Sequence, residues 1–285
     1  MKKALFFPLQ LSLCTVGYLY ASSNISQAQQ RDLTWRGNIA VTLAQVTTDG
    51  TLDTQVNQNN NVAEITGGEN RGGNLFHSFQ DFSVGTGNEA FFNNASDISN
   101  IFSRVTGGNI SNINGAIRAN GSASLFLINP AGIIFGENAR LDIGGSFYGS
   151  SASSILFEDG EFSAADLENP PLLTVNAPIG LGFRDNPGEI THRSRFDNAG
   201  LQVVAGEDIA LLGGDINLEG GLITASEGKI TLGGLNTTGT INVTETNSFT
   251  FPEEISNKSN VFLTQQAGVD VRGAVGGSIQ VNANN

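Results

Sequence analysis

The sequence predicts an all-β fold in which the mature part of the chain winds into a parallel β-solenoid. Gly contributes 36 of the 285 residues and Pro only 7, so tight turns are frequent, and short apolar alternations replace helical spacing. Hydrophobic residues make up 39% of the chain, which can supply a continuous core. Isoleucine also recurs at a fixed short period in the C-terminal half, as expected of stacked units.

Residues 1–28 have the pattern of a secretory signal peptide. Two lysines precede an apolar stretch, and Ser26 and Ala28 place small residues at the −3 and −1 positions of a cleavage site. The alternative is a membrane anchor, which needs about 20 uninterrupted apolar residues, whereas Pro8 breaks this run. We expect export, with the single cysteine, Cys14, leaving with the leader.

Charge and cysteine content exclude several classes of function. The net charge of −13 repels phosphate backbones, so nucleic acid is not an expected partner. A mature chain without cysteine has no disulfide framework, no thiolate nucleophile and no cysteine-ligated metal. We expect no metal and no other cofactor.

The clearest repeat has a period of seven residues. Its isoleucines are each followed by a Gly-bearing turn, and a leucine lies two places after three of them. Seven residues fit a strand of three or four residues plus a turn, so each unit is interpreted as one stacked rung. The alternative is a series of ordinary hairpins in a β-sandwich. The isoleucines are Ile209, Ile216, Ile223 and Ile230.

Phenylalanine is concentrated between residues 70 and 162. We expect these rings to plug the end of the solenoid, whose first rung otherwise exposes an apolar edge. An aromatic ligand-binding groove is the alternative. The rings include Phe76, Phe79, Phe82, Phe91, Phe92, Phe102, Phe126, Phe135, Phe147 and Phe157.

The rung pattern breaks at residues 246–260, which predicts an exposed excursion or hairpin. The pattern then resumes and stops part-way at Asn285, which leaves open whether further rungs follow. The expected organisation is a signal peptide at 1–28, a solenoid domain with its cap at 29–245, and the excursion with the start of further rungs at 246–285.

Two apolar stretches flank the sequence Asn129-Pro130-Ala131-Gly132. Asn129 can cap a tight corner with its side chain, and Pro130 holds φ at about −65° at the next position. Gly132 can supply the positive φ that the exit needs, and Ile133 restarts the strand. A tight turn between two strands is therefore predicted.

A second stretch runs from Asn74 to Val84 and continues to Asn93 and Asn94. Together with the turn, it resembles the N-terminal secretion domain of two-partner-secreted, filamentous-haemagglutinin-like exoproteins, whose hallmark turn reads Asn-Pro-Asn-Gly followed by Ile or Leu. Ala131 departs from that turn. Residues 69–72, Glu-Asn-Arg-Gly, stand where an Asn-Pro-Asn motif often precedes the second stretch.

The resemblance spans roughly Gln45 to Leu235 and implies a right-handed parallel β-helix with N-terminal capping strands. It implies recognition by the periplasmic soluble domains of an outer-membrane transporter barrel, and release of an adhesin-like exoprotein at the cell surface or outside. Both motifs become candidate recognition residues; the alternative, that they only close a rung or build the core and cap, stays open. The turn motif comprises Asn129, Pro130, Gly132 and Ile133, and the second motif Asn74, Phe76, His77, Phe79, Phe82, Asn93 and Asn94.

Catalytic chemistry finds little support. His77 lies among phenylalanines, which is typical of a structural residue, and His192 falls in a charged stretch predicted to be a loop. The acidic run from Asp159 to Glu168 has no nearby basic residue and predicts a solvated loop. We expect no enzyme. The alternatives are a polysaccharide-acting solenoid enzyme and a self-contained adhesive solenoid that binds a carbohydrate or protein receptor on a host cell or surface.

Overall fold

The structure is a computed structural model that describes residues 45–168, 173–244, 248–253 and 258–284, with the backbone of two short strands before them. Those strands, β1 (Trp35–Arg36) and β2 (Ile39–Ala40), pair antiparallel in a unit formed by residues 1–40. The expected signal peptide lies outside the described residues. The second unit, residues 41–285, carries the other strands.

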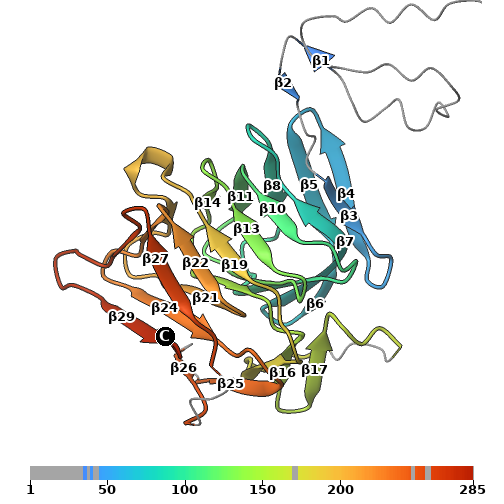
Figure 1. Cartoon of the computed structure of the whole chain (residues 1–285). Coiled ribbons are helices and arrows are strands. Elements are labelled where there is room, and N and C mark those ends of the chain that lie inside the picture. The colour runs from blue at the N-terminus through green and yellow to red at the C-terminus, as the bar shows by residue number, and fades with distance from the viewer. Residues whose placement is uncertain are drawn as a thin grey trace, which may run out of the picture. The chain divides into compact units, whose positions relative to one another are not determined.

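The second unit is a parallel β-helix whose coils have three sides (Figure 1). The long side contains, in spatial order, β29 (Ser278–Asn282), β24 (Lys229–Gly234), β21 (Ile209–Gly213), β15 (Phe147–Ser150), β12 (Ser124–Ile128), β9 (Asn100–Val105), β7 (Asn74–Ser83) and β3 (Gln45–Thr48). The second side contains β10 (Ser111–Ile113), β13 (Ile133–Phe135), β19 (Ile190–His192), β22 (Ile216–Glu219) and β27 (Val261–Thr264).

The third side consists of two sheets. The first contains β14 (Arg140–Asp142), β11 (Ala116–Ala119), β8 (Glu89–Phe92), β5 (Val62–Gly67) and β4 (Thr54–Asn59). The second contains β20 (Leu201–Gln202), β23 (Leu222–Thr224) and β28 (Gly268–Asp270). The described residues also hold a 3₁₀ turn at Phe196–Asn198, and no helix among them is long and apolar enough to cross a membrane.

Each seven-residue unit forms one side of a coil, and three units make one coil. Ile209 pairs in parallel with Ile230, three units later, whereas Ile216 lies on the second side and Ile223 on the third. The interpretation of one unit as one stacked rung was therefore wrong. Each Gly-bearing corner bends the chain only part of the way round, so units that are neighbours in sequence lie on different sides.

Antiparallel strands cover the N-terminal end of the β-helix, which confirms the expected cap. β3 and β6 (Glu69–Arg71) both pair antiparallel with β7, and β4 forms a hairpin with β5. Val46 and Ile65 on these strands are buried. The cap thus encloses apolar surface that an open first coil would leave in water.

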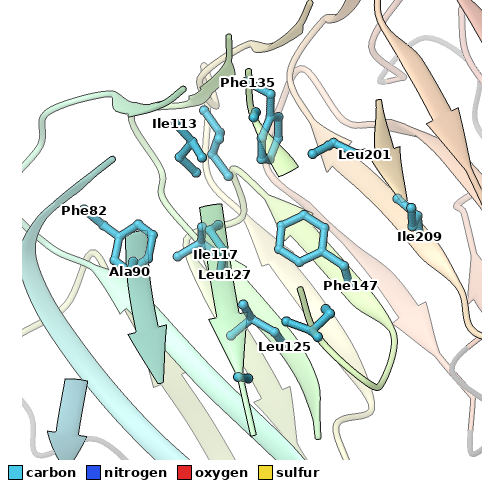
Figure 2. Packing of buried hydrophobic residues seen from close by; sticks show 14 of the residues in the cluster. Phe82, Ala90, Ile113, Ile117, Leu125, Leu127, Phe135, Phe147, Leu201 and Ile209 are labelled. Carbon is cyan, nitrogen blue, oxygen red and sulfur yellow. The ribbon is translucent and has the colours of Figure 1, made fainter. Parts of the chain in front are cut away.

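Apolar side chains from the three sides fill the interior of the β-helix. Figure 2 shows Phe82, Leu125, Phe147 and Ile209 pointing into this shared interior. On the long side, the register aligns residues from successive coils in one inward-facing ladder. Its members are Leu75, Ile101, Leu125, Phe147, Ile209 and Ile230.

Two insertions leave the β-helix at the same corner, between the long side and the second side. The first contains β16 (Ser154–Phe157), β17 (Gly160–Ser163) and β18 (Gly180–Phe183), and the second contains β25 (Gly239–Val243) and β26 (Phe249–Thr250). β18 pairs antiparallel with β25, so both insertions belong to one sheet. We call this sheet the outer sheet.

The outer sheet covers the outward face of the long side and forms a second apolar core. Phe76, Phe102, Phe126 and Tyr148 stack there in order, with centroid distances of 5.1, 4.9 and 4.4 Å between neighbours. The expectation that the phenylalanines plug the end of the solenoid was therefore wrong for this outward group. Phe79, Phe82, Phe92, Phe135 and Phe147 lie in the interior instead.

The hairpin expected at residues 246–260 is formed by β25 and β26 and begins earlier, at Gly239, and its expected exposure was wrong. Phe249 and Phe251 are 3% and 8% exposed and belong to the second core. Phe251 lies against Gly233 of β24, where an added Cβ atom would be 3.0 Å from its ring. Phe249 packs against Tyr148, with a centroid distance of 5.7 Å.

Candidate functional site

The predicted turn joins β12 to β13 at the corner between the long and second sides. Asn129 Oδ1 accepts a hydrogen bond from the Ala131 amide (3.0 Å), and the Asn129 carbonyl accepts one from the Gly132 amide (2.9 Å). Gly132 has φ of +110°. The side-chain cap on the turn and the positive φ both agree with the local prediction.

The turn is bonded to the coils on both sides of it. Asn129 Nδ2 donates to the Asn109 carbonyl (2.9 Å) and to Ser111 Oγ (2.8 Å) in the preceding coil. In the following coil, the Gly188 amide donates to the Pro130 carbonyl (2.9 Å). Asn129 has no exposed surface, so in the folded protein its side chain serves the stacking of coils.

Ile133 is likewise buried, whereas Pro130 and Ala131 are half-buried. The surface of the turn that a partner could touch in the folded protein is therefore that of Pro130 and Ala131. Gly132 has no room for a side chain, because a Cβ atom would lie 2.6 Å from the Glu189 carbonyl oxygen of the next coil.

The second motif divides between the two cores and a corner. Phe76 faces the outer sheet, and His77, Phe79 and Phe82 face the interior. His77 Nδ1 lies 3.3 Å from Thr54 Oγ1, and burial lowers the pKa of its ring to about 3. His77 is therefore a neutral structural residue in the core, as its neighbours in sequence indicate.

The asparagines of the second motif hold the corner that leads into the long side. Asn74 Nδ2 donates to the carbonyls of Thr174 (3.1 Å) and Asn176 (2.9 Å). Asn94 and Asn120, in successive coils, bond to each other through side chain and backbone at 3.0 to 3.1 Å. Asn93 is exposed.

The second motif runs along the whole length of its strand, so only its first residues are far from the turn. Asn74 aligns with Asn100, at the start of the long side, whereas Asn129 follows the last residue of β12, so these two asparagines lie at opposite ends of the strands. Phe79 lies at the same end as Asn129, two coils earlier, and its ring is buried in the interior.

Comparison with known proteins gives this architecture a family. The family model of the TPS secretion domain matches residues 44–283. This chain belongs to the TPS secretion domain family. The resemblance drawn from the two motifs is confirmed, and the match extends past the span over which those motifs were recognised.

One curated relative of this TPS secretion domain is a heme/hemopexin-binding protein of Haemophilus influenzae. It is 28% identical over 151 residues, which is 53% of this chain and 15% of the relative. The chain thus spans a small part of that relative's length.

Two solved structures are similar to this chain. One is the filamentous hemagglutinin secretion domain, at 17% identity and a TM-score of 0.47, covering 83% of this chain and 77% of that one. The other is the HMW1 secretion domain from Haemophilus influenzae, at 20% identity and a TM-score of 0.49, covering 83% and 56%.

Two further predictions from the sequence of this TPS secretion domain differ from the structure. The sequence predicts a charged loop around His192, and this is wrong. His192 lies in β19 and is completely buried, with Nε2 2.8 Å from the Leu222 carbonyl oxygen. Burial lowers the pKa of its ring to about 4, against the raising effect of the Leu222 bond. The sequence signal was present, because Ile190 and His192 alternate inward with Thr191 between them.

The acidic run was expected to be a solvated loop. Asp159 and Glu161 are exposed, but they belong to the β16–β17 hairpin. The sequence signal for this hairpin is the pair Phe157 and Phe162, which lie on either side of the turn. Both rings are buried in the second core.

A groove of about 740 Å³ lies beside the loop that follows β19. Arg193 and Glu219 meet there in an ion pair of 2.7 Å, and the Arg195 guanidinium donates to the carbonyls of Gly220 and Gln266. These charged groups are partnered within the protein. Among the described residues, no group of three or more acidic, histidine or cysteine side chains could hold a metal ion.

Proposed function

We propose that this chain directs the export of an exoprotein through a transporter barrel in the outer membrane. The match of the TPS secretion domain to residues 44–283 is the observation that carries this proposal. Residues 1–28 are then the signal peptide. The secretion domain does not end at residue 245, because the family match runs to residue 283 and takes in the β25–β26 hairpin and the last coil. The partner is the soluble periplasmic part of the barrel, and the net charge of −13 argues against a nucleic acid partner.

Because the turn motif is buried in the folded protein, the barrel can recognise its side chains only at certain stages of export. Asn129 and Ile133 are fully enclosed once the neighbouring coils have stacked. A partner that recognises these side chains must do so before the β-helix closes. We therefore propose recognition of an extended chain in the periplasm, followed by folding outside the cell.

Stacking of coils provides a driving force for export. Ile209, Ile230 and Leu232 are completely buried by the neighbouring coils. Fully burying such a side chain stabilises by about 1.5 to 3 kcal/mol, so each coil that forms outside opposes return of the chain.

The exoprotein as a whole is proposed to be adhesin-like and to act at the cell surface or in the medium. The curated relative carries a ligand-binding name, yet this chain corresponds to only 15% of its length. We therefore assign binding of any host-cell carbohydrate or protein receptor to the remainder of the exoprotein. The proposed role of the present chain is to direct secretion, without catalysing a reaction.

The test is secretion of the epitope-tagged full-length chain from a Gram-negative host, with and without a transporter barrel encoded beside it. We expect release into the medium only when the barrel is present. Release without the barrel, or retention of a protease-resistant chain in the periplasm in both cases, contradicts the proposal.

Two turn variants separate a folding role from direct contact. Gly132→Val places a side chain against the Glu189 carbonyl and should reduce release by preventing coil closure. Ala131→Arg alters the half-buried surface of the turn and should leave folding intact. If Ala131→Arg alone abolishes release while the purified variant is as stable as the parent, the turn segment contacts the barrel directly and its role is not confined to coil closure.

A further inference from the structure

Arg104 is a buried arginine in β9 that neither core explains. Its side chain is 1% exposed, and it lies in a strand whose neighbours are apolar or hydroxyl-bearing. A buried guanidinium requires hydrogen-bond acceptors and a compensating charge. Both are supplied by segments far away in the sequence.

Two hydroxyl groups connect Arg104 to a carboxylate in the cap. Arg104 Nε donates to Ser78 Oγ (2.8 Å), and Ser78 Oγ donates to Asp49 Oδ2 (2.6 Å). Arg104 Nη2 donates to Thr51 Oγ1 (2.9 Å), and Thr51 Oγ1 donates to Asp49 Oδ1 (2.8 Å). The Asp49 carboxylate and the Arg104 guanidinium are therefore linked by two hydrogen-bonded paths, one through each hydroxyl group.

A third segment covers the other edge of the guanidinium. Arg104 Nη1 donates to the Ser163 carbonyl at the end of β17, and its Cζ lies 4.7 Å from the centre of the Phe162 ring. Thr51 is 53 residues before Arg104, and Ser163 is 59 residues after it. One side chain thus joins the cap, an early coil and the first insertion.

We propose that Arg104 is a latch that makes closure of the N-terminal cap conditional on docking of the β16–β17 hairpin. Without Asp49, the guanidinium is buried with no compensating charge beneath the hairpin. Without the hairpin, it loses the Ser163 carbonyl and the covering ring, and water reaches its bonds to the cap. The cap supplies the compensating charge for the guanidinium, and the hairpin supplies its last acceptor and its cover from water. Stable burial of Arg104 therefore needs both segments.

The consequence for export rests on the proposed function. The cap can lock only when residues 49 and 163 are on the same side of the outer membrane. The latch therefore keeps the N-terminal part of the domain open until the first insertion has crossed.

The latch is tested by hydrogen–deuterium exchange on the purified, folded, full-length chain, with no transporter present. In Asp49→Asn we expect amides of β16 and β17 to exchange at least tenfold faster. The hydrogen bonds of this carboxylate go to Thr51, Ser78 and Thr106, outside the hairpin, so such an effect must pass through Arg104. In Phe162→Leu we expect the same acceleration at the amides of Thr51 and Ser78.

Asp81→Asn is the matched control. This carboxylate also lies beside the cap, where it accepts from Thr47 and Asn109, but it makes no bond to Arg104 or its partners. Acceleration confined to the cap in Asp49→Asn, or equal acceleration of the hairpin in Asp81→Asn, overturns the latch. These outcomes do not depend on secretion, so failure of the latch leaves the proposed function standing.

Discussion

Gly132 combines two constraints in one residue, a positive φ and the absence of space. Replacing it with alanine strains the backbone at φ of +110° and brings Cβ to 2.6 Å from the Glu189 carbonyl oxygen. We expect Gly132→Ala to lower the free energy of unfolding by on the order of 2 to 4 kcal/mol. Urea unfolding measures this change.

Gly87→Ala separates the two constraints. Gly87 has φ of +77°, and a Cβ atom added there would meet no other atom within 4 Å, so only the backbone strain, about 1 kcal/mol, applies. Equal losses in the two variants would show that contact with the next coil contributes nothing to the glycine requirement.

Two buried histidines make the stability of the domain sensitive to mild acid. Burial lowers the pKa of His77 to about 3 and that of His192 to about 4, from 6.5 in the unfolded chain. The unfolded chain therefore binds more protons, so stability is full above pH 6.5 and falls as the pH drops. By pH 5.5 each histidine should remove about 1.4 kcal/mol.

His192→Leu should halve this loss between pH 7 and 5.5, as measured by urea unfolding at each pH. The window ends at pH 5.5 so that carboxylates stay charged. An unchanged pH dependence in the variant would mean that His192 titrates normally in the folded protein.

At this scale, the sequence predicts what depends on adjacent residues. The cap from Asn129 to the Ala131 amide and the positive φ of Gly132 follow from local turn chemistry. The bond from Asn129 to Ser111 does not, because its partner lies in the preceding coil. The same holds for Arg104, which stands out in its strand but reveals no partner.

At the scale of elements, a repeat period indicates strand and corner lengths but not how many units complete a coil. The isoleucine ladder from Ile209 to Ile230 and Ile279 becomes visible only when the strands are paired. Ile230 is completely buried between its neighbours, and Ile279 is 45% exposed in the last strand. The two positions carry the same side chain and are aligned in the ladder, but they differ in burial.

We therefore expect Ile230→Ala to cost about 2 to 4 kcal/mol of unfolding free energy and Ile279→Ala less than about 1 kcal/mol. The midpoints of urea unfolding compare them directly. A loss at Ile279 as large as that at Ile230 would indicate that the last strand is more deeply enclosed than the structure shows.

For the molecule as a whole, the second core is the feature that could not be predicted from the sequence. In β7, apolar residues occupy successive positions, so both faces of the strand are apolar, which predicts burial but does not say against what. The answer lies in β16, β18 and β25, which leave the β-helix at one corner in two different coils. No local pattern links β18 to β25, because their pairing joins separate insertions.

This link should make the later coils unfold together instead of fraying one by one, as a simple repeat does. Ile241 in β25 is fully buried and pairs with Leu181 in β18. We expect Ile241→Ala to accelerate hydrogen exchange in β18 and β16 of the first insertion as well as in β25 and β26.

Ile279→Ala serves as the control, because Ile279 lies on β29, outside the outer sheet. It should leave exchange in β16 and β18 unchanged. If Ile241→Ala accelerates only β25 and β26, the two insertions open independently. The outer sheet would then consist of a three-stranded part, β17, β16 and β18, and a separate β25–β26 hairpin, and each part would stabilise only the coil from which it leaves.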